Sequence, residues 1–404
     1  MGAFTIDGAR VWPVPPNWDN GVTETLAWST DVLQASGTAI SKHRQLLVAP
    51  RRGFAFEILE DRQARRVADA LLAGYGGDWL LPIWPDVQFV AGLDLVAGDE
   101  FIACETVGFD FASGAKALLW SGVNDWEVVD VDEVTDTGLA LAAPLAATWT
   151  EGGVRLYPLR RARVHDGAEE TLYSDDASKR SMTFDIADAC DWPALSVDEI
   201  ATYLGHPVLD VRPTETDDAT ASYSRLAQTV DYGTADPLVH DLPGVALRAQ
   251  KSQWALGDRA AHTWFRSLLY TLCGRRSPIW MPSWASDLVP TAAIAAGDTA
   301  LTIEWAAYTL FGLGQANRQY VRIELVDGTV LYRRIVAAVE GDATETLTLS
   351  SSLSDSSIQP GAVRLISFMA LSTLASDAIE IDHKADADGL ATATTGWQAV
   401  VSDV

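Results

Sequence analysis

The stretch SPIWMPSWASDL, residues 277–288, places two tryptophans and two prolines in a dozen positions, directly after an amphipathic run. A similar segment follows an earlier amphipathic run, where residues 81–87 read LPIWPDV. Pro82-Ile83-Trp84 therefore recurs as Pro278-Ile279-Trp280, 196 residues later. A tripeptide match alone is weak, so the neighbouring residues decide whether the chain contains a repeat.

The residues around the two tripeptides also recur, in the same order. Asp61 and Asp258 each open a run whose apolar residues fall at helical spacing, which predicts one helix at about 61–73 and another at about 258–273. An Asp at the start of a helix suits the capping of its free N–H groups. The other recurring landmarks are Ala97-Gly98-Asp99 with Ala296-Gly297-Asp298, Leu139, Leu141 and Leu145 with Leu347, Leu349 and Leu353, and Val154-Arg155-Leu156 with Val363-Arg364-Leu365. The constant order predicts a duplicated domain of about 200 residues rather than a solenoid, whose periods are shorter.

Outside the two helices, short runs of alternating apolar residues separated by turns predict strands. In GFAFEIL, for example, Phe54, Phe56 and Ile58 share one face. The predicted fold is mainly β with a few helices (α+β), in two tandem homologous domains that each carry one helix and an inserted small β-domain, whose strand rhythm suits a small barrel. The predicted boundaries are 1–195 for the first repeat (core 1–90 and 161–192, insert about 91–160), 196–218 for a linker, and 219–404 for the second repeat (core 219–287 and 368–404, insert about 288–367).

The composition is that of a globular chain with a strong acidic excess. The 404 residues carry a formal net charge of −26. Nucleic-acid affinity comes from clustered Lys and Arg, so this balance argues against specific nucleic-acid binding. Cys104, Cys190 and Cys273 show no paired spacing, which argues against a disulfide framework or a zinc site. The N-terminus lacks a signal-peptide pattern and no stretch approaches 18 uncharged apolar residues, so we expect a soluble chain made in a reducing cytoplasm, without membrane insertion.

Motifs that carry chemistry are missing from the sequence. The six histidines are scattered, and no His-Glu-x-x-His pair, Gly-x-Ser-x-Gly elbow or Walker loop is present. DVDEVTD (130–136) resembles a calcium loop only in its acid content, because it lacks the central Gly and the closing Glu. In so acidic a chain, carboxylates that are close in sequence single out no acid–base pair. We therefore predict no enzyme activity, no catalytic or metal-binding residues and no cofactor.

A short basic cluster is the first candidate for an interface. Arg51 and Arg52 follow soon after Lys42-His43-Arg44 in an otherwise acidic chain. Such a cluster could pair with an acidic surface of a neighbouring subunit. The alternative, a solvated strand end, is equally compatible with the sequence.

Tryptophans are the second candidate, because the 15 in this chain are typical of both cores and interfaces. Trp84, Trp280 and Trp284 are selected for their place in the repeated aromatic-proline segments. We expect the two Pro-Ile-Trp segments to occupy equivalent positions. Trp84 and Trp280 should then pack beneath their preceding helices.

Taken together, these residues resemble a known family. The segment VWPVPPNWDNGVTETLAWSTDVLQASGTAISKHRQLLVAPRRGFAFEI, residues 11–58, is similar to the opening of tail proteins from siphophages and related prophages. The similarity rests on Trp12-Pro13, the run from Trp28 to Val32, the basic run from Lys42 to Arg52, and the aromatic strand from Phe54 to Glu57. A helix followed by Pro-Ile-Trp also fits the pattern. A looser likeness is to distal tail proteins, which form the ring between tail tube and tail tip.

The resemblance implies a structural protein of the virion, assembled in the host cytoplasm, with no catalytic residues. It implies a hub-type β-barrel with a helix in each repeat, and the tail tube protein, the tape measure protein and the tail-tip hub proteins as partners. Tail tubes are six-fold and tail tips are commonly three-fold. A duplicated chain could bridge that mismatch as a homotrimer, whose six domains form a pseudo-six-fold ring of heterologous contacts.

Two other functions remain open at this stage. Exposed Trp and acidic residues also suit a carbohydrate- or receptor-binding tail module, which would bind cells or envelope glycans by itself. An envelope-degrading hydrolase would need a carboxylate pair in a cleft, which the sequence does not single out.

Overall fold

The structure is a computed structural model that describes residues 5–73, 76–90, 94–150, 152–165, 168–214, 220–386 and 388–401. Strands dominate these residues and form large antiparallel sheets, with only two α-helices among them. The prediction of a mainly β fold is therefore confirmed. Both predicted helices are present, within one residue of the expected bounds: α1 covers Arg62–Leu72 and α2 covers Arg259–Leu272.

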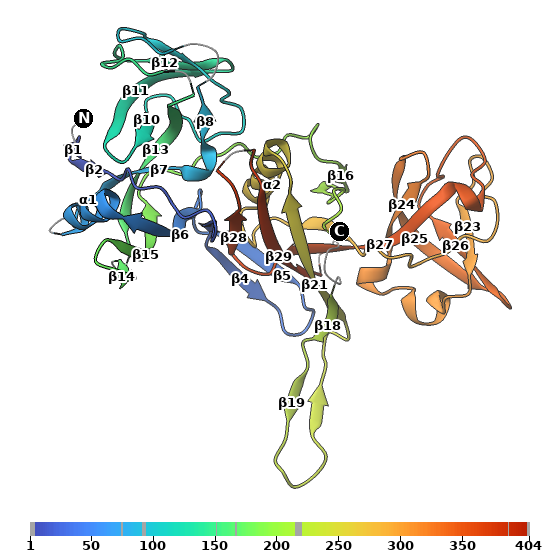
Figure 1. Cartoon of the computed structure of the whole chain (residues 1–404). Coiled ribbons are helices and arrows are strands. Elements are labelled where there is room, and N and C mark those ends of the chain that lie inside the picture. Colours follow the sequence, from blue (N-terminus) through green and yellow to red (C-terminus); the bar gives the residue numbers. More distant parts are fainter. Residues whose placement is uncertain are drawn as a thin grey trace.

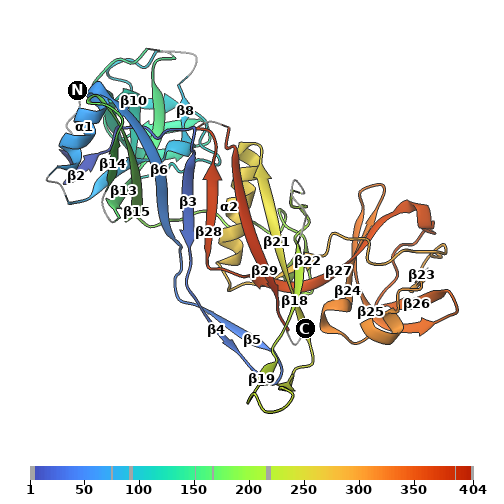
Figure 2. The ribbon, with the colours of Figure 1, turned by 60° about the horizontal axis from the view of Figure 1, so that its bottom comes forward.

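An eight-stranded antiparallel sheet runs through the centre of the molecule (Figure 2). Its fourth and fifth strands come from opposite ends of the chain, so the first and last parts of the sequence share one sheet. In spatial order, the strands are β14 (Glu169–Leu172), β15 (Ala177–Ile186), β6 (Arg51–Asp61), β3 (Val22–Ala27), β28 (Ala378–His383), β29 (Ala391–Ala399), β21 (Ala246–Leu256) and β18 (Ala221–Arg225).

In the first half of the chain, α1 directly follows β6 and leads to β7 (Trp79–Pro82). Strand β7 pairs antiparallel with β13 (Arg155–Val164) and parallel with β2 (Ala9–Val11), which also pairs with β1 (Thr5–Ile6). Alternation in β6 buries Phe54, Phe56 and Ile58 on one face, as predicted. These side chains form one core with Ala68 and Leu71 of α1.

The second half repeats this order of elements. Helix α2 follows β21 and leads to β22 (Ile279–Pro282), which pairs antiparallel with β27 (Val363–Leu374). Val208 makes a parallel bridge to Trp280, as β2 does to β7. Phe265, Leu268 and Leu269 of α2 pack in a second core. At the start of α2, the Asp258 side chain accepts a hydrogen bond from the Ala261 N–H, the cap that the sequence predicts.

In each half, the chain leaves the core elements to form an outer lobe and then returns. The two lobes lie at opposite sides of the central sheet (Figure 1). Each lobe has a hydrophobic core of its own. The first contains η1 (Trp84–Asp86), β8 (Gln88–Phe89), β9 (Phe101–Ala103), β10 (Lys116–Gly122), β11 (Asp125–Thr135) and β12 (Gly138–Leu141); the second contains β23 (Ala300–Glu304), η2 (Tyr308–Gly312), η3 (Ala316–Arg318), β24 (Tyr320–Leu325), β25 (Val330–Glu340), β26 (Thr344–Leu349) and η4 (Pro360–Ala362).

Each half also sends out a hairpin at the same place in its strand order. The chain leaves the sheet after β3 and returns in β6, and it leaves after β18 and returns in β21. The hairpin of the second half projects far from the body of the molecule (Figure 1). The hairpin strands are β4 (Thr30–Gln34), β5 (Ser41–Gln45), β19 (Gln228–Val230) and β20 (Leu238–His240).

The two Pro-Ile-Trp segments are not structurally equivalent, so that prediction was wrong. Trp280 lies inside β22, and its carbonyl accepts a hydrogen bond from Leu209. The corresponding acceptor in the first half is Leu80, bonded by Trp12, whereas Trp84 lies beyond the end of β7. The cause is helix length, because α2 has 14 residues and α1 has 11. The difference is close to one turn of helix, and it shifts the register of the sequence behind it.

The segment predicted as a linker, 196–218, is described as far as residue 214, and within that part most of its residues are exposed and a few are buried. It contains a small hairpin, β16 (Thr202–Tyr203) with β17 (His206–Pro207). Val208 and Leu209 are fully buried and belong to two different clusters of the second half. This stretch therefore stabilises the second half rather than joining two independent bodies.

Candidate functional site

The junction between the two halves contains a buried charged residue, Glu24. It lies on β3 between Val22 and Leu26, so the alternation of the strand turns it inward with them. Its two carboxylate oxygens contact Arg52 Nε at 2.6 Å, Arg266 Nη2 at 2.7 Å and His383 Nε2 at 2.9 Å. Arg52 comes from the first half, whereas α2 and β28 supply the other two. Glu24 therefore ties the two halves together by charge as well as by strand pairing.

Two further carboxylates extend this ionic cluster. Asp110, in the first lobe, bonds to Arg52 and contacts Arg160 at 2.5 Å. Asp86, in η1, contacts Arg259 of α2 at 2.7 Å. Both carboxylates are almost fully buried. The cluster thus links the central sheet, the first lobe and the helix of the second half.

Electrostatics keep Glu24 and Asp110 ionised despite their burial. Burial alone would raise the pKa of Glu24, but the guanidiniums of Arg266 and Arg52 outweigh it and hold that pKa well below its usual value. The same balance, with Arg52 and Arg160 as the cations, lowers the pKa of Asp110. An uncompensated charge at such a site costs several kcal/mol, so each member of the cluster depends on its partners.

Glu24, His262 and His383 form a set of potential metal ligands, with their ligand atoms within 4.8 Å of one another and all three residues buried. Two His and one carboxylate can hold a transition metal. Here, however, Glu24 already contacts two guanidiniums, and the surrounding cluster contains four Arg against three carboxylates. A divalent cation would add to that positive excess. The arrangement therefore suits an internal ion-pair cluster better than a metal centre.

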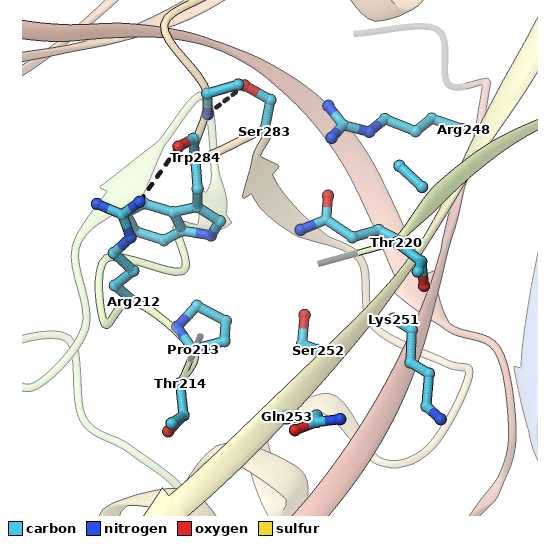
Figure 3. A pocket seen from close by; sticks show the side chains of 13 residues that line it. Arg212, Pro213, Thr214, Thr220, Arg248, Lys251, Ser252, Gln253, Ser283 and Trp284 are labelled. Atoms are coloured by element: carbon cyan, nitrogen blue, oxygen red, sulfur yellow. Dashed lines mark hydrogen bonds between the residues drawn. The ribbon is translucent and has the colours of Figure 1, made fainter. Parts of the chain in front are cut away.

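A pocket of about 250 Å³ lies beside β18, at one end of the central sheet. Arg248 and Lys251 extend from β21 on one side, and Arg212 lies next to the Trp284 ring on the other (Figure 3). The guanidinium of Arg212 is 6.0 Å from the centre of that ring. None of the described residues that line the pocket carries a carboxylate. In a chain with a net charge of −26, this is a local positive surface suited to an acidic partner.

Cys104 and Cys190 do not supply a reactive thiolate. Burial raises the pKa of Cys104 to about 12, and it also raises the pKa of Cys190. A thiol must lose its proton before it can act as a nucleophile. Both side chains are therefore poor nucleophiles where they lie.

The basic residues selected from sequence separate in the structure. Arg52 is 5 % exposed and forms its ion pairs within its own chain, at the junction. Arg51 is exposed on the opposite face of β6. The suggested pairing of this cluster with a neighbouring subunit therefore does not apply to Arg52. It stays a prediction for Arg51 and for Lys42 and Arg44, which are exposed on β5.

The selected tryptophans also occupy different environments. Trp84 is buried in the core that contains α1, and its ring lies 4.9 Å from that of Tyr157. Trp280 is equally buried but belongs to a separate cluster with Tyr320, apart from the α2 core. The expected packing beneath the preceding helix therefore fits Trp84 and is wrong for Trp280. Trp284 is half-buried at the basic pocket, where Arg322 lies 4.9 Å above its ring.

Sequence reasoning did not single out Glu24, Arg266 or the histidines beside them. A usable signal was present, because each charged residue occupies an inward position of an amphipathic element. Glu24 alternates with Val22 and Leu26, and Arg266 lies among the apolar positions of α2. A charge at a core position implies a buried partner, although local sequence does not say which one.

Comparison with known proteins does not assign the chain. Within the described residues, no helix combines the length and the apolar character needed to cross a membrane. No protein-family model matches the sequence, and no curated protein matches it either.

Proposed function

We propose that the chain consists of two tandem homologous units and acts as a ring-forming structural protein of a long, non-contractile phage tail, at the distal end of the tail tube. The duplication is supported by the common order of strand, helix and strand in β6–α1–β7 and β21–α2–β22. In each unit the strand after the helix pairs with the strand that returns from the outer lobe. Each unit is a hub-type barrel core with one helix and an inserted lobe.

One observation carries the structural role. The pairing of β28 with β3 joins the end of the second unit to the start of the first in a head-to-tail manner. Repetition of such a heterologous contact generates a ring when the rotation closes. The sequence resemblance to siphophage tail proteins gives this ring its place, between the tail tube and the tail-tip hub. Three copies supply six units, which would match a six-fold tube to a three-fold tip.

The partners that follow are the tail tube protein, the tape measure protein and the tail-tip hub proteins. The working location is the virion, after assembly in the host cytoplasm. The buried charges of this chain serve to join its units rather than to catalyse a reaction. No specific binding of nucleic acid is expected, since the chain is strongly acidic.

Copy number in intact particles tests this function. Symmetry-resolved imaging or quantitative mass spectrometry of purified tails should find three copies of the chain at the distal end of each tube. Six copies would contradict the pseudo-six-fold ring, because twelve units would then surround the axis. Absence of the chain from purified tails would reject the virion role itself.

A receptor- or carbohydrate-binding tail module is the second candidate, and a surface of the second lobe favours it. Trp305 is 48 % exposed and its indole N–H donates to Glu340 Oε1 at 3.0 Å. Leu310 and Phe311, both in η2, are exposed close by in sequence. Aromatic faces next to a carboxylate suit a sugar ring. Binding of the purified chain to host cells or envelope glycans, lost in Trp305→Ala, would support this second function.

A further inference from the structure

We infer that the free edge of β14 in one copy of this chain pairs with the free edge of β18 in the next copy. This surface rests on the ring proposed above and specifies how its copies meet. The partner is thus a second copy of the same chain, bound by extension of the central sheet. The inference follows from the junction that the chain already makes with itself.

The junction between β28 and β3 is the template for this contact. It pairs six consecutive residues of each strand in antiparallel register, from Ala378 with Ala27 to His383 with Val22. Strand β28 precedes the last strand of the second unit and lies beside it. In the first unit, β14 holds the same place beside β15. The first unit therefore has an edge equivalent to the one that β28 offers to β3.

The other side of the template has an equivalent as well. Strand β3 lies beside β6, the strand that precedes α1, and continues into a hairpin. Strand β18 lies beside β21, the strand that precedes α2, and continues into the second hairpin. The outer edge of β18 in the second unit therefore corresponds to the edge of β3 that pairs with β28 in the first unit.

Both edges are exposed and lie at the two ends of the same sheet. All four residues of β14 and all five of β18 are exposed. Among the described residues, β14 pairs only with β15 and β18 only with β21. Unpaired N–H and C=O groups at a sheet edge form a template for another strand. A head-to-tail assembly would remove both edges at once.

The two edges also carry opposite charge. Glu169 and Glu170 lie in β14, and Asp175 and Asp176 follow in its turn. Strand β18 borders Arg248 and Lys251 of β21, whereas Arg225 at its end is already paired with Asp241. Complementary charge of this kind fixes orientation and disfavours wrong partners.

Glu169 and Lys251 are the pair best suited to test the charge complementarity. The registers of the intervening strands connect them: Glu169 lies opposite Ser181, Thr392 opposite Asp382, and Lys251 opposite Gly396. Followed through β6, β3 and β28, these registers place both side chains on the same face of the sheet. Each is exposed in the single chain. In a continued sheet, β18 would lie between their strands, and the two side chains would face each other across it from neighbouring copies.

Photo-cross-linking of the full chain tests the pairing directly. Tyr223, in β18 and 55 % exposed, is replaced by benzoyl-phenylalanine, and this chain is mixed with an isotope-labelled chain that lacks the probe. After illumination and digestion with trypsin, we expect the probe to capture the labelled peptide 164–179, which contains β14. The same probe at Val239, on the projecting hairpin, should not capture this peptide.

Charge exchange gives the second readout. Lys251→Glu in the probe-bearing chain should lower the capture of peptide 164–179 by about tenfold, equivalent to about 1.4 kcal/mol. Glu169→Lys in the labelled chain should restore the capture of β14, which is then measured on peptide 170–179, because trypsin also cleaves after the new lysine. Arg364→Glu, an equal change of charge on the exposed start of β27, should leave capture unchanged. If neither Lys251→Glu nor Glu169→Lys changes the amount of peptide captured, the charge pairing is overturned.

The pairing and the proposed function fail in different ways. No capture between copies at any chain concentration or in purified tails, or capture that maps to another peptide, overturns the β14–β18 contact. A ring of three copies seen in tails without this cross-link would overturn the contact and keep the function. A specific cross-link by a chain that is absent from tails would keep the contact and reject the function.

Discussion

Arg266, on the helix of the second half, donates a hydrogen bond to Glu24, on a strand of the first half, at 2.7 Å, and both side chains are buried. The two residues are 242 positions apart in the chain. Strand β28, which carries His383 to the same carboxylate, lies directly beside β3. The two halves are therefore joined by continuous backbone pairing with a charged centre beneath it.

The first prediction concerns this ion pair. Arg266→Met removes the cation and leaves Glu24 buried with fewer partners, so we expect a loss of about 3–5 kcal/mol in the free energy of unfolding. Urea denaturation at neutral pH measures it. Arg364→Met is the matched control, because Arg364 is 61 % exposed in its pair with Glu324 and should cost at most about 1 kcal/mol. Equal effects of the two substitutions would contradict the role given to the junction.

The second prediction concerns pH. Burial, followed by the charge of Arg266, lowers the pKa of His262 well below its usual value of 6.5, so the folded chain keeps this ring neutral. The unfolded chain takes up a proton as the pH falls through that usual value, and stability is then lost by up to about 1.4 kcal/mol per pH unit. Neither ring nitrogen has a hydrogen-bond partner among the described residues, so His262→Leu removes a titrating group without breaking such a bond.

We therefore expect His262→Leu to flatten the dependence of stability on pH between about pH 7 and about pH 5. Urea denaturation at several pH values measures the slope in both proteins. Below this window, Glu24 adds a separate loss. Because its folded pKa is depressed, its contribution is present above the usual carboxylate value and disappears as the pH falls through the folded pKa. An unchanged slope between pH 7 and pH 5 in the variant would show that His262 is not the group responsible.

The third prediction separates two buried tryptophans. Trp84→Ala and Trp280→Ala should each lower stability by about 3–5 kcal/mol, whereas Trp305→Ala, at a half-exposed site, should cost much less. Substitution by Phe distinguishes Trp84 from Trp280. The Trp280 indole donates to the Tyr203 carbonyl at 2.8 Å, while that of Trp84 has no acceptor among the described residues.

Trp280→Phe should therefore cost about 1 kcal/mol more than Trp84→Phe, the usual worth of one hydrogen bond. Thermal and urea unfolding of the five variants supply the comparison. If Trp280→Ala unfolds like the unmodified chain, its burial does not stabilise this protein, and an interface role for the residue gains support.

The sequence was informative wherever the signal was local. Helical spacing behind Asp61 and Asp258 predicted both helices, and alternation at Phe54, Phe56 and Ile58 predicted the buried face of β6. Pairing between distant strands has no such local signal, because the period of two fixes which face is buried but not which strand lies alongside. Periodicity therefore does not predict that β28 pairs with β3, nor which residues surround the buried Glu24.

The match of the two tripeptides was misleading for a different reason. The predicted helices, 61–73 and 258–273, differ in length by three residues, as α1 and α2 do. Identical tripeptides 196 residues apart therefore lie at different distances from the ends of their helices. Trp280 falls inside a strand, where Leu80 is its counterpart, and its neighbours differ from those of Trp84.

The last prediction concerns the two outer lobes, which the sequence predicts as two inserted β-domains of the same kind. The α2 core of the second half contains no residue from 288–366, and the separate cluster around Trp280 loses only Tyr320 among its buried residues, so deleting that span and joining its flanks by a short Gly-Ser link should leave a folded chain. The first lobe differs, because Leu118 and Trp126 pack in the core of the first half. It also supplies Asp110 to the buried guanidiniums of Arg52 and Arg160.

Deletion of 91–153 therefore uncovers an apolar core and leaves two buried or partly buried cations without their common partner, a loss of several kcal/mol for the charges alone. We expect this variant to lose cooperative unfolding and to aggregate, while the second-lobe deletion keeps its β-sheet circular dichroism and a single thermal transition. The two deletion variants are measured side by side at equal protein concentration. Aggregation of the second-lobe deletion with loss of sheet signal, or a cooperative transition in the first-lobe deletion, would show that the division of the cores does not govern how these lobes attach.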